Sequence, residues 1–187
     1  MQQTQPHVIW INGAFGSGKT TAAKLLAQKV PGAVIVDPEE IGALLRPVLQ
    51  PVVPVHDFQE WPAWRKLVAS TLNAVLRELP EDSPMIIVVP QTVTVEDYWS
   101  EITSDLDPSV RLTPVVLNID LVEHRRRAEE DTEEPDALRW RLNNFPVFQQ
   151  SAWLRRAFTD IDVSSLTQEQ TVAAIRAVAF PPDPEAV

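Results

Sequence analysis

The chain has 187 residues, of which 44% are hydrophobic and 22% are charged, as expected of one folded globular domain. Its formal net charge of -10 argues against a nucleic-acid partner, because nucleic-acid phosphates are bound by clustered Lys and Arg. The sequence contains no cysteine, which excludes disulfides, thiolate nucleophiles and Cys-ligated metals.

The first part of the chain alternates short apolar runs with helix-forming stretches. Unbroken runs of β-branched and aromatic residues are typical of strands that are buried on both faces. The order strand, helix, strand, helix indicates a parallel sheet with helical crossovers, and hence an α/β fold. The sequence predicts these elements as a strand at 8–11, a helix at 19–30, a strand at 33–36 and a helix from Asp37 to about Arg46.

The next stretch, residues 47–61, is too rich in proline for a regular helix, because proline lacks the backbone N–H that a helix needs. From Pro62, apolar residues recur at helical spacing, which predicts an amphipathic helix that ends at Pro80. We see no repeat and no domain boundary, so we expect one domain over 1–187 with a frayed tail at 181–187. The remaining predicted elements are strands at 85–89, 115–119 and 160–163, helices at 95–106, 121–130 and 167–180, and a weaker helical region at 137–158.

The turn between the first strand and the first helix completes a Walker A motif. A chance match in a glycine-rich turn is the alternative, but the flanking strand and helix are the context that the motif requires. Its glycines allow successive backbone N–H groups to surround an anion at the N-terminus of a helix. Lys19 can then reach the β- and γ-phosphates of ATP, and the Thr20 hydroxyl can ligate Mg²⁺. The predicted nucleotide-binding residues are Gly13, Ala14, Phe15, Gly16, Ser17, Gly18, Lys19, Thr20 and Thr21.

Asp37 follows the second predicted strand, and open α/β sheets bind ligands at the carboxyl ends of their strands. It could accept a proton from a substrate hydroxyl or hold Mg²⁺. Asp37, Pro38 and Glu40 equally match the start of a capped helix, and the two roles can coexist. The third strand ends in Pro90-Gln91 and carries no acid, so an ordinary Walker B aspartate is missing there. This disfavours motor ATPases and GTPases and favours Asp37 as base or Mg²⁺ ligand.

Residues 57–65, which we call the 57–65 segment, combine aromatic and polar side chains just before and within the amphipathic helix. Trp64 begins the apolar stripe of that helix and fits the core better than a ligand site. Arg65 lies off the stripe, where it is either solvated or in contact with substrate. Asp57 is an alternative base, because functional residues are frequent in loops. The predicted substrate residues are Arg46, Asp57, Trp64, Arg65 and Gln91.

Three consecutive arginines lie on the helix that follows the fourth strand. Neighbouring residues of a helix point about 100° apart, so the three cannot all face one ligand. We expect a helical lid at about 121–143, in which Arg125 and Arg126 neutralise phosphate charge when the lid closes. Pairing with the neighbouring acidic residues is the alternative for each single arginine.

The N-terminus lacks the basic and apolar regions of a signal peptide, and the longest apolar runs are too short to span a bilayer. We therefore expect a soluble, cytoplasmic protein that is a monomer or homodimer. Its expected partner is a small-molecule acceptor, and we expect neither a nucleic-acid nor a membrane partner.

These motifs, in this order, resemble the tunicamycin-resistance proteins, which are small P-loop kinases similar also to chloramphenicol phosphotransferases and to shikimate and nucleoside monophosphate kinases. The resemblance weakens after Val89-Pro90, and the proline-rich stretch at 47–54 departs from it. The residues that carry it are Ile9-Trp10-Ile11-Asn12 before the Walker A motif, Asp37-Pro38-Glu39 with Gly42 and Leu45-Arg46, and Asp57-Phe58-Gln59 with Trp64-Arg65.

The resemblance implies a P-loop fold with a five-stranded parallel sheet, the use of ATP and Mg²⁺, and phosphorylation of a hydroxyl on a small molecule or antibiotic. Asp37 occupies the position at which similar antibiotic kinases carry their catalytic acid. Two other functions stay open. One is a metabolic kinase for a nucleotide or small acid, bound by Arg46 and Arg65. The other is a nucleotide-binding sequestration protein without transfer activity.

Overall fold

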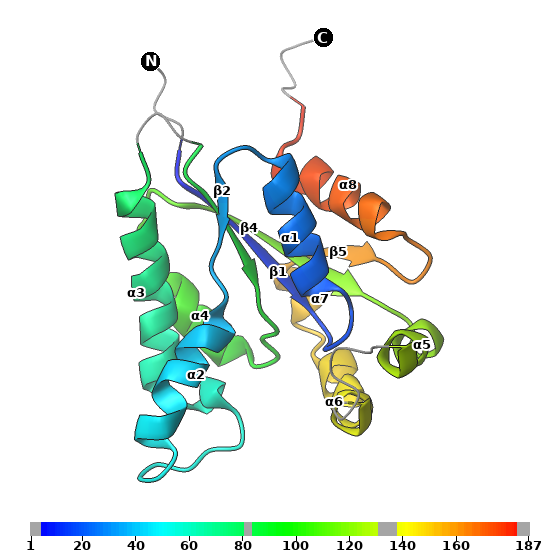
Figure 1. The fold of residues 1–187 in the computed structure, drawn as a ribbon, viewed down its shortest axis with the longest axis horizontal. Coiled ribbons are helices and arrows are strands. Elements are labelled where there is room, and N and C mark those ends of the chain that lie inside the picture. The colour runs from blue at the N-terminus through cyan, green and yellow to red at the C-terminus, as the bar shows by residue number, and fades with distance from the viewer. Residues whose placement is uncertain (1–4, 81–83, 131–137, 183–187) are drawn as a thin grey trace.

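The computed structural model describes residues 5–80, 84–130 and 138–182. Its strands form a single five-stranded sheet in the order β2-β3-β1-β4-β5, and every neighbouring pair is parallel (Figure 1). The predicted α/β fold with a five-stranded parallel sheet is therefore confirmed. The strands are β1 (His7–Gly13), β2 (Ala33–Ile35), β3 (Ile86–Pro90), β4 (Arg111–Asn118) and β5 (Thr159–Asp162).

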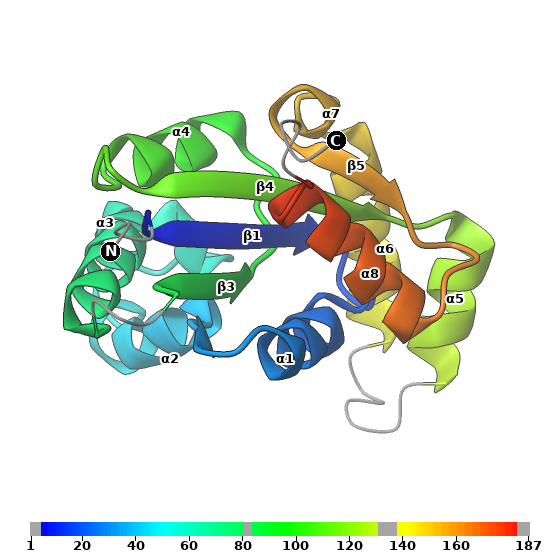
Figure 2. The ribbon, with the colours of Figure 1, turned by 90° about the horizontal axis from the view of Figure 1, so that it is seen from above.

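Helices flank the sheet on both sides (Figure 2). Within the described part of the chain, no helix is both long and apolar enough to cross a membrane. The helices are α1 (Lys19–Lys29), α2 (Pro38–Leu49), the 3-10 helix η1 (Phe58–Glu60), α3 (Pro62–Glu78), α4 (Glu96–Ser104), α5 (Leu121–Glu130), α6 (Leu138–Gln150), α7 (Leu154–Ala157) and α8 (Gln168–Ala179).

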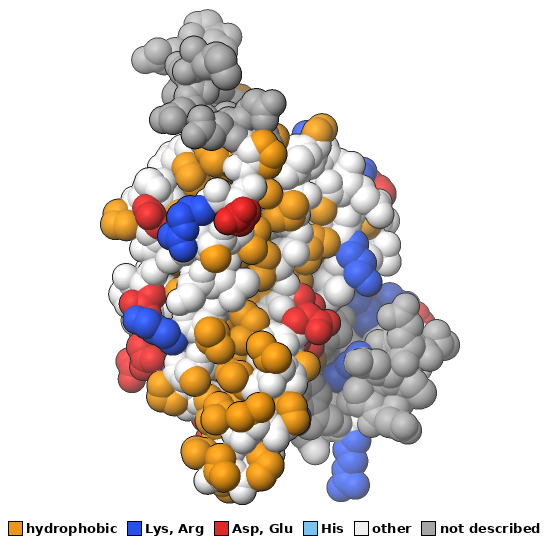
Figure 3. All heavy atoms as spheres, turned by 60° about the vertical axis from the view of Figure 1, so that its left-hand side comes forward, with side chains coloured by type: hydrophobic (Ala, Val, Ile, Leu, Met, Phe, Trp, Pro, Cys, Tyr) orange, Lys and Arg blue, Asp and Glu red, His pale blue; other side chains and the backbone are white. Residues whose placement is uncertain are grey.

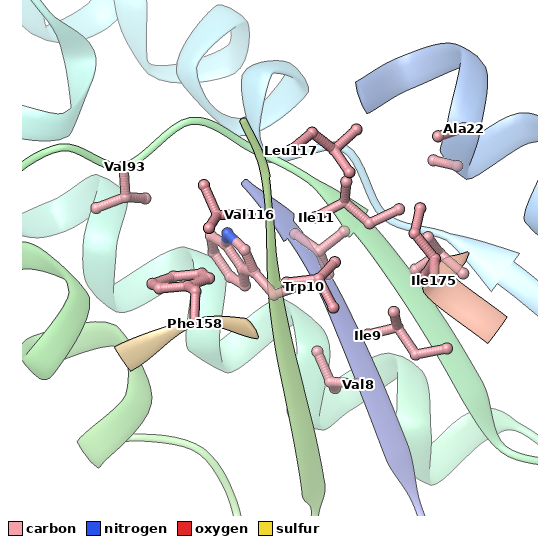
Figure 4. Packing of buried hydrophobic residues seen from close by; sticks show 14 of the residues in the cluster. Val8, Ile9, Trp10, Ile11, Ala22, Val93, Val116, Leu117, Phe158 and Ile175 are labelled. Carbon is pink, nitrogen blue, oxygen red and sulfur yellow. The ribbon is translucent and has the colours of Figure 1, made fainter. Parts of the chain in front are cut away.

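The central strand β1 is buried on both faces, as its unbroken apolar sequence predicts. Ile9 and Ile11 point toward α1 and α8, where Ala22 and Ile175 lie (Figure 4). Trp10 points to the opposite face and packs edge-on against Trp99 of α4, with ring centroids 5.1 Å apart. Burial of each such side chain contributes about 1.5–3 kcal/mol, so β1 anchors the carboxyl edge of the sheet at which the Walker A turn begins.

The structure corrects the prediction that the second helix ends near Arg46. The helix runs on to Leu49 with Pro47 inside it, and the N–H of Gln50 still donates to the carbonyl of Arg46 at 3.0 Å. Pro47 has no N–H to donate to the carbonyl of Ala43, which would be its helical partner. Both residues are exposed, so water can donate to that carbonyl instead. Figure 3 shows hydrophobic side chains gathered on the face that α2 and the segment after it form, and the most exposed of these are Leu44, Val48, Val52 and Val53.

The fourth strand starts at Arg111, earlier than the predicted start at residue 115. Pro114 obscured its first half, because proline is rare inside a paired strand. At Pro114 only the β1 side of β4 is paired, since β5 begins to pair at Val115. The weak helical region predicted at 137–158 is divided into α6 and α7. Residues 131–137 of the predicted lid and 183–187 of the predicted tail lie outside the described residues.

Candidate active site

The Walker A turn joins the end of β1 to the start of α1, as predicted. Its central residues form a tight turn in which the N–H of Ser17 donates to the carbonyl of Ala14 at 3.0 Å. Gly16 has a φ of 83° and Gly18, the N-cap of α1, has a φ of 96°. Glycine adopts these left-handed angles without steric cost, which is why the turn needs glycine at both positions.

Lys19 is the first residue of α1 and is buried beneath the turn. Its Nζ donates a hydrogen bond to the carbonyl of Ala14 at 2.9 Å and lies 5.2 Å from the centre of the Phe15 ring. Burial lowers the pKa of Lys19 to about 8; the charge of Arg141 acts in the same direction, and Glu39 and Asp37 oppose it. The ammonium group is thus near enough to Glu39, Arg141 and Asp37 for their charges to act on it.

Asp37 begins α2 and has the cap geometry that the sequence indicated. Its Oδ1 accepts a hydrogen bond from the N–H of Glu39 at 3.0 Å. Among the described residues this cap engages only one carboxylate oxygen, so the other is compatible with a second role. Thr20 is exposed in the first turn of α1, beside Lys19. A hydroxyl and a carboxylate are oxygen ligands that suit Mg²⁺ held mainly by nucleotide phosphates.

The described residues contain no cluster of three or more His, Cys, Asp or Glu side chains able to hold a metal ion by themselves. Few protein ligands are typical of Mg²⁺ sites in which substrate phosphates complete the coordination. The oxygens of Thr20 and Asp37 are ligands of the kind that such a magnesium ion takes.

The structure separates the arginines of α5 by the direction in which they point. Arg126 pairs with Glu123 and Glu130 on its own helix, at 2.7 and 2.5 Å, and Arg125 is exposed. Arg127 also pairs with Glu123, at 2.7 Å, but its guanidinium faces the Walker A turn and donates to the carbonyls of Ser17 and Val163 at 3.2 and 2.8 Å. The arginine with a hydrogen bond to this turn is thus the one that follows the expected pair Arg125 and Arg126.

A second arginine reaches the turn from α6. Arg141 is only 9% exposed, and its Cδ lies 3.8 Å from the position that a Cβ on Gly16 would occupy. Its guanidinium charge also contributes to the low pKa of Lys19. Arg127 and Arg141 therefore flank the Walker A turn from the two helices of the predicted lid.

An open groove of about 710 Å³ lies beside the turn, between α5 and the start of α8. Glu123 lines it, and the hydrogen bonds from Arg126 and Arg127 hold the pKa of this carboxyl down to about 2. The groove is large enough for the base and ribose of a nucleotide. Besides these side chains it is lined by Gly16, Ser17, Gly18, Thr21, Ala22, Glu130, Ser164, Ser165, Leu166, Thr167, Gln168 and Thr171.

Three of the predicted substrate residues are buried. Trp64 is 0% exposed and its Nε1 donates to the carbonyl of Pro38 at 2.9 Å, so it links α3 to α2. Arg65 pairs with Glu101 at 2.6 Å and lies 4.3 Å from the Tyr98 ring centre. Gln91 is 0% exposed as well. In this structure these side chains position neighbouring backbone and present almost no surface to a ligand.

Asp57 and Arg46 are the predicted substrate residues that are exposed. Although Asp57 as a residue is exposed, desolvation of its carboxyl raises the pKa, with repulsion from Glu60 in the same direction and attraction to Arg46 against it. Asp57 also caps η1 by accepting the N–H of Gln59 at 2.9 Å. A raised pKa is the property expected of a general base, so Asp57 stays the alternative base.

Several residues that shape the site were not predicted from the sequence. His124 contacts the Walker A turn, and Gln59 and Thr92 connect the 57–65 segment to it. The sequence did contain a signal for which residues of α5 face the site. His124, Arg127 and Ala128 have the spacing of one helix face, and all three point inward. Gln59 and Thr92 have no such signal, since their contact joins residues far apart in the chain.

No protein-family model and no curated protein matches the sequence. A tunicamycin resistance protein from Deinococcus radiodurans has a similar structure, with a TM-score of 0.60 and 26% identity over 92% of this chain and 94% of that one. A sugar kinase from Janibacter sp. has a TM-score of 0.63 and 19% identity over 95% and 96% of the two chains. A gluconokinase from Sinorhizobium meliloti has a TM-score of 0.57 and 19% identity over 94% of each. The predicted resemblance is confirmed: this chain has the fold of the P-loop kinases.

Proposed function

We propose that this protein is an ATP-dependent phosphotransferase that acts on a hydroxyl group of a small molecule. The observation that carries the proposal is a buried Lys19 at a glycine-shaped anion-binding turn, with the carboxylate of Asp37, at the start of α2, near enough for its charge to act on the Lys19 pKa. Lys19 and the turn can bind an ATP phosphate, and Asp37 can take the proton of an acceptor hydroxyl. The kinases among the similar structures support the same reaction class.

In the proposed reaction the acceptor hydroxyl oxygen attacks the γ-phosphorus of ATP. The bond between this phosphorus and the oxygen that bridges to the β-phosphate breaks, and ADP leaves with that electron pair. The hydroxyl proton passes to the carboxylate of Asp37. Lys19, Arg127 and Arg141 balance the charge on the phosphate oxygens. Thr20 would hold Mg²⁺, which neutralises phosphate charge when it is bound; Asp37 is the alternative ligand if it does not serve as the base.

The first acceptors to test are antibiotics of the tunicamycin or nucleoside type. The similarity to a tunicamycin resistance protein, over nearly the full length of both chains, supports this choice. A resistance role would follow if phosphorylation inactivates such a compound. The groove and the exposed residues Arg46 and Asp57 are the surfaces available for nucleotide and acceptor.

An anionic acceptor, as in a metabolic kinase for a nucleotide or small acid, has less support. Such an acceptor needs convergent arginines. Arg65 is engaged by Glu101, by the Tyr98 ring and by the carbonyl of Gln59, which leaves Arg46 as the exposed candidate of the two. Competition by nucleoside monophosphates for acceptor binding would favour this second function.

The decisive experiment incubates the protein with ATP, Mg²⁺ and a panel of hydroxylated acceptors, tunicamycin among them, and follows acceptor mass. We expect the mass of one phosphoryl group to be added. Asp37→Asn is the matched variant, because Asn is also a good N-cap and preserves α2 while removing the carboxylate. It should lower kcat by about a hundredfold or more and leave ATP binding intact. Turnover equal to that of the parent would rule out Asp37 as the base. ATP binding without transfer to any acceptor would instead favour a sequestration protein.

A further inference from the structure

The peptide unit between Phe15 and Gly16 is held from outside the Walker A turn. His124 of α5 is fully buried, and its Nε2 lies 2.8 Å from the carbonyl oxygen of Phe15. A carbonyl oxygen only accepts hydrogen bonds, so Nε2 must carry the proton. The Phe145 ring of α6 stacks on the imidazole, with centroids 4.1 Å apart and planes 24° apart. The donor of this hydrogen bond is therefore fixed in both position and tautomer.

The peptide that His124 contacts is the central peptide of the turn from Ala14 to Ser17. Gly16, third in this turn, has a φ of 83°. Met85 is the only non-glycine residue with a positive φ in the described chain, so Phe15 has a negative φ, and the turn is of type II. A type I turn has the same ends and differs by a flip of this central peptide. Because glycine adopts either conformation readily, the turn itself does not select between them.

The two turn types differ in where the N–H of Gly16 points. In a trans peptide the C=O and the N–H point in opposite directions. While His124 holds the Phe15 carbonyl toward α5, the Gly16 N–H points away from α5, toward the side of the turn on which a phosphate would bind. Arg127 acts in the same way two residues later, because its bond to the Ser17 carbonyl orients the N–H of Gly18.

We propose that His124 is a positioning residue that selects the turn conformation in which the Gly16 N–H can bind phosphate. The inference rests on the proposed function, in that the anion is an ATP phosphate. It makes α5 a preorganising element of the phosphate site. Burial, with the charges of Arg141 and Lys19, lowers the pKa of His124 against the opposing bond to Phe15, which is consistent with a neutral ring that offers a single N–H donor.

The test measures ATP binding by titration calorimetry in the absence of acceptor. His124→Phe keeps an aromatic ring against Phe145 and removes the donor; we expect Kd for ATP to rise about tenfold, as for the loss of one well-placed hydrogen bond. His124→Gln places an amide N–H near the position of the imidazole Nε2 and should restore Kd to within about threefold. Glu129→Gln, on the exposed side of α5, is the matched control and should bind ATP as the parent does.

Gly16→Ala tests the same peptide without touching His124. A Cβ on Gly16 would lie 3.8 Å from the Arg141 Cδ and 4.0 Å from the His124 Nε2, which are ordinary contacts, so no clash would explain a loss. An alanine at a φ of 83° is strained and favours the flipped peptide. We expect Kd to rise as in His124→Phe, and the double variant to be no weaker than the weaker single variant.

Unchanged ATP affinity in His124→Phe, or additive losses in the double variant, would overturn the inference and leave the kinase proposal standing. ATP binding that depends on His124, without transfer to any acceptor, would contradict the kinase proposal alone. A parent protein that binds no ATP would overturn both. A crystal structure of His124→Phe without nucleotide adds a direct measurement, in which a peptide unchanged from the parent would also refute the selection.

Discussion

Gln59 and Thr92 connect the 57–65 segment to the phosphate site. The Nε2 of Gln59 donates to the carbonyl of Thr92 at 3.0 Å and lies 3.3 Å from the Asp57 Oδ2. The Thr92 hydroxyl in turn donates to the carbonyl of Gly13, the first residue of the Walker A motif, at 2.7 Å. A continuous chain of hydrogen bonds thus runs from Asp57, a candidate for binding the substrate, past the end of β3 to the Walker A turn.

Replacing Gln59 should break the hydrogen-bonded connection between the 57–65 segment and the Walker A turn. Gln59→Met has a similar volume and no amide, so it leaves the Asp57 carboxylate and the Thr92 carbonyl each without one donor. We expect the free energy of unfolding to fall by about 1–3 kcal/mol, and the acceptor KM to rise more than the ATP KM. Urea unfolding and steady-state kinetics measure both. Gln28→Met, at an exposed position of α1, is the control; equal effects of the two substitutions would show that the chain of hydrogen bonds has no such role.

Arg65 offers a test of whether its role is structural. Its guanidinium serves Glu101 and the Gln59 carbonyl at once, and a lysine ammonium cannot reproduce that geometry. We expect Arg65→Lys to lower the free energy of unfolding by about 1–3 kcal/mol, and saturating acceptor not to mask this loss. Thermal unfolding with and without acceptor checks this. Unchanged stability combined with lost acceptor binding would instead identify Arg65 as a substrate contact.

The sequence was sufficient for the sheet and the phosphate turn because both depend on local patterns. An unbroken apolar run gave β1, and glycine spacing before Lys19 gave the anion-binding turn. Local patterns misled where a proline lies in an element that its surroundings tolerate. Pro47 is exposed on α2, and Pro114 lies where β4 is paired on one side only.

The rest of the site could not be predicted, because it depends on contacts between distant segments. Arg126 and Arg127 are adjacent and chemically identical, and both pair with Glu123, yet Arg127 in addition donates to the Ser17 carbonyl of the Walker A turn. Arg65 seemed available because it lies off the apolar stripe of α3, and only the packing of α4 against α3 brings Glu101 and Tyr98 to it. Helical periodicity gives the direction of a side chain but not what lies opposite.

The low pKa of Lys19 predicts that ATP binding weakens in alkaline solution. Burial brings this pKa to about 8 in the free protein, and the negative charge of bound phosphate must raise it. Above pH 8 the free protein therefore has to take up a proton when ATP binds, so affinity should fall by up to about tenfold per pH unit. Calorimetric titration between pH 7.5 and 9.5 measures this slope. Lys19→Arg keeps its charge over this range, and a slope as steep in this variant as in the parent would contradict the assignment to Lys19.

His7, at the start of β1, predicts a separate pH dependence of stability far from the phosphate turn. It is buried, with its Nε2 2.9 Å from the Thr113 Oγ1, and burial together with Arg111 lowers its pKa to about 4. Above pH 6.5 the ring is neutral in both the folded and the unfolded chain, so its full contribution is present there. As the pH falls from 6.5 toward 4, only the unfolded chain binds the proton, and stability should decrease by roughly 3 kcal/mol, at about 1.4 kcal/mol per pKa unit.

His7→Gln removes the titrating group and retains a side chain that can bond to Thr113. The difference in the free energy of unfolding between parent and variant, measured in urea at pH 7.5 and pH 4.5, isolates His7 from the other groups that titrate. The parent should lose more stability than the variant between these two pH values. Equal losses would mean that His7 is protonated as readily in the folded chain as in the unfolded one, and would contradict the burial of an uncharged imidazole between β1, β4 and the Phe180 ring.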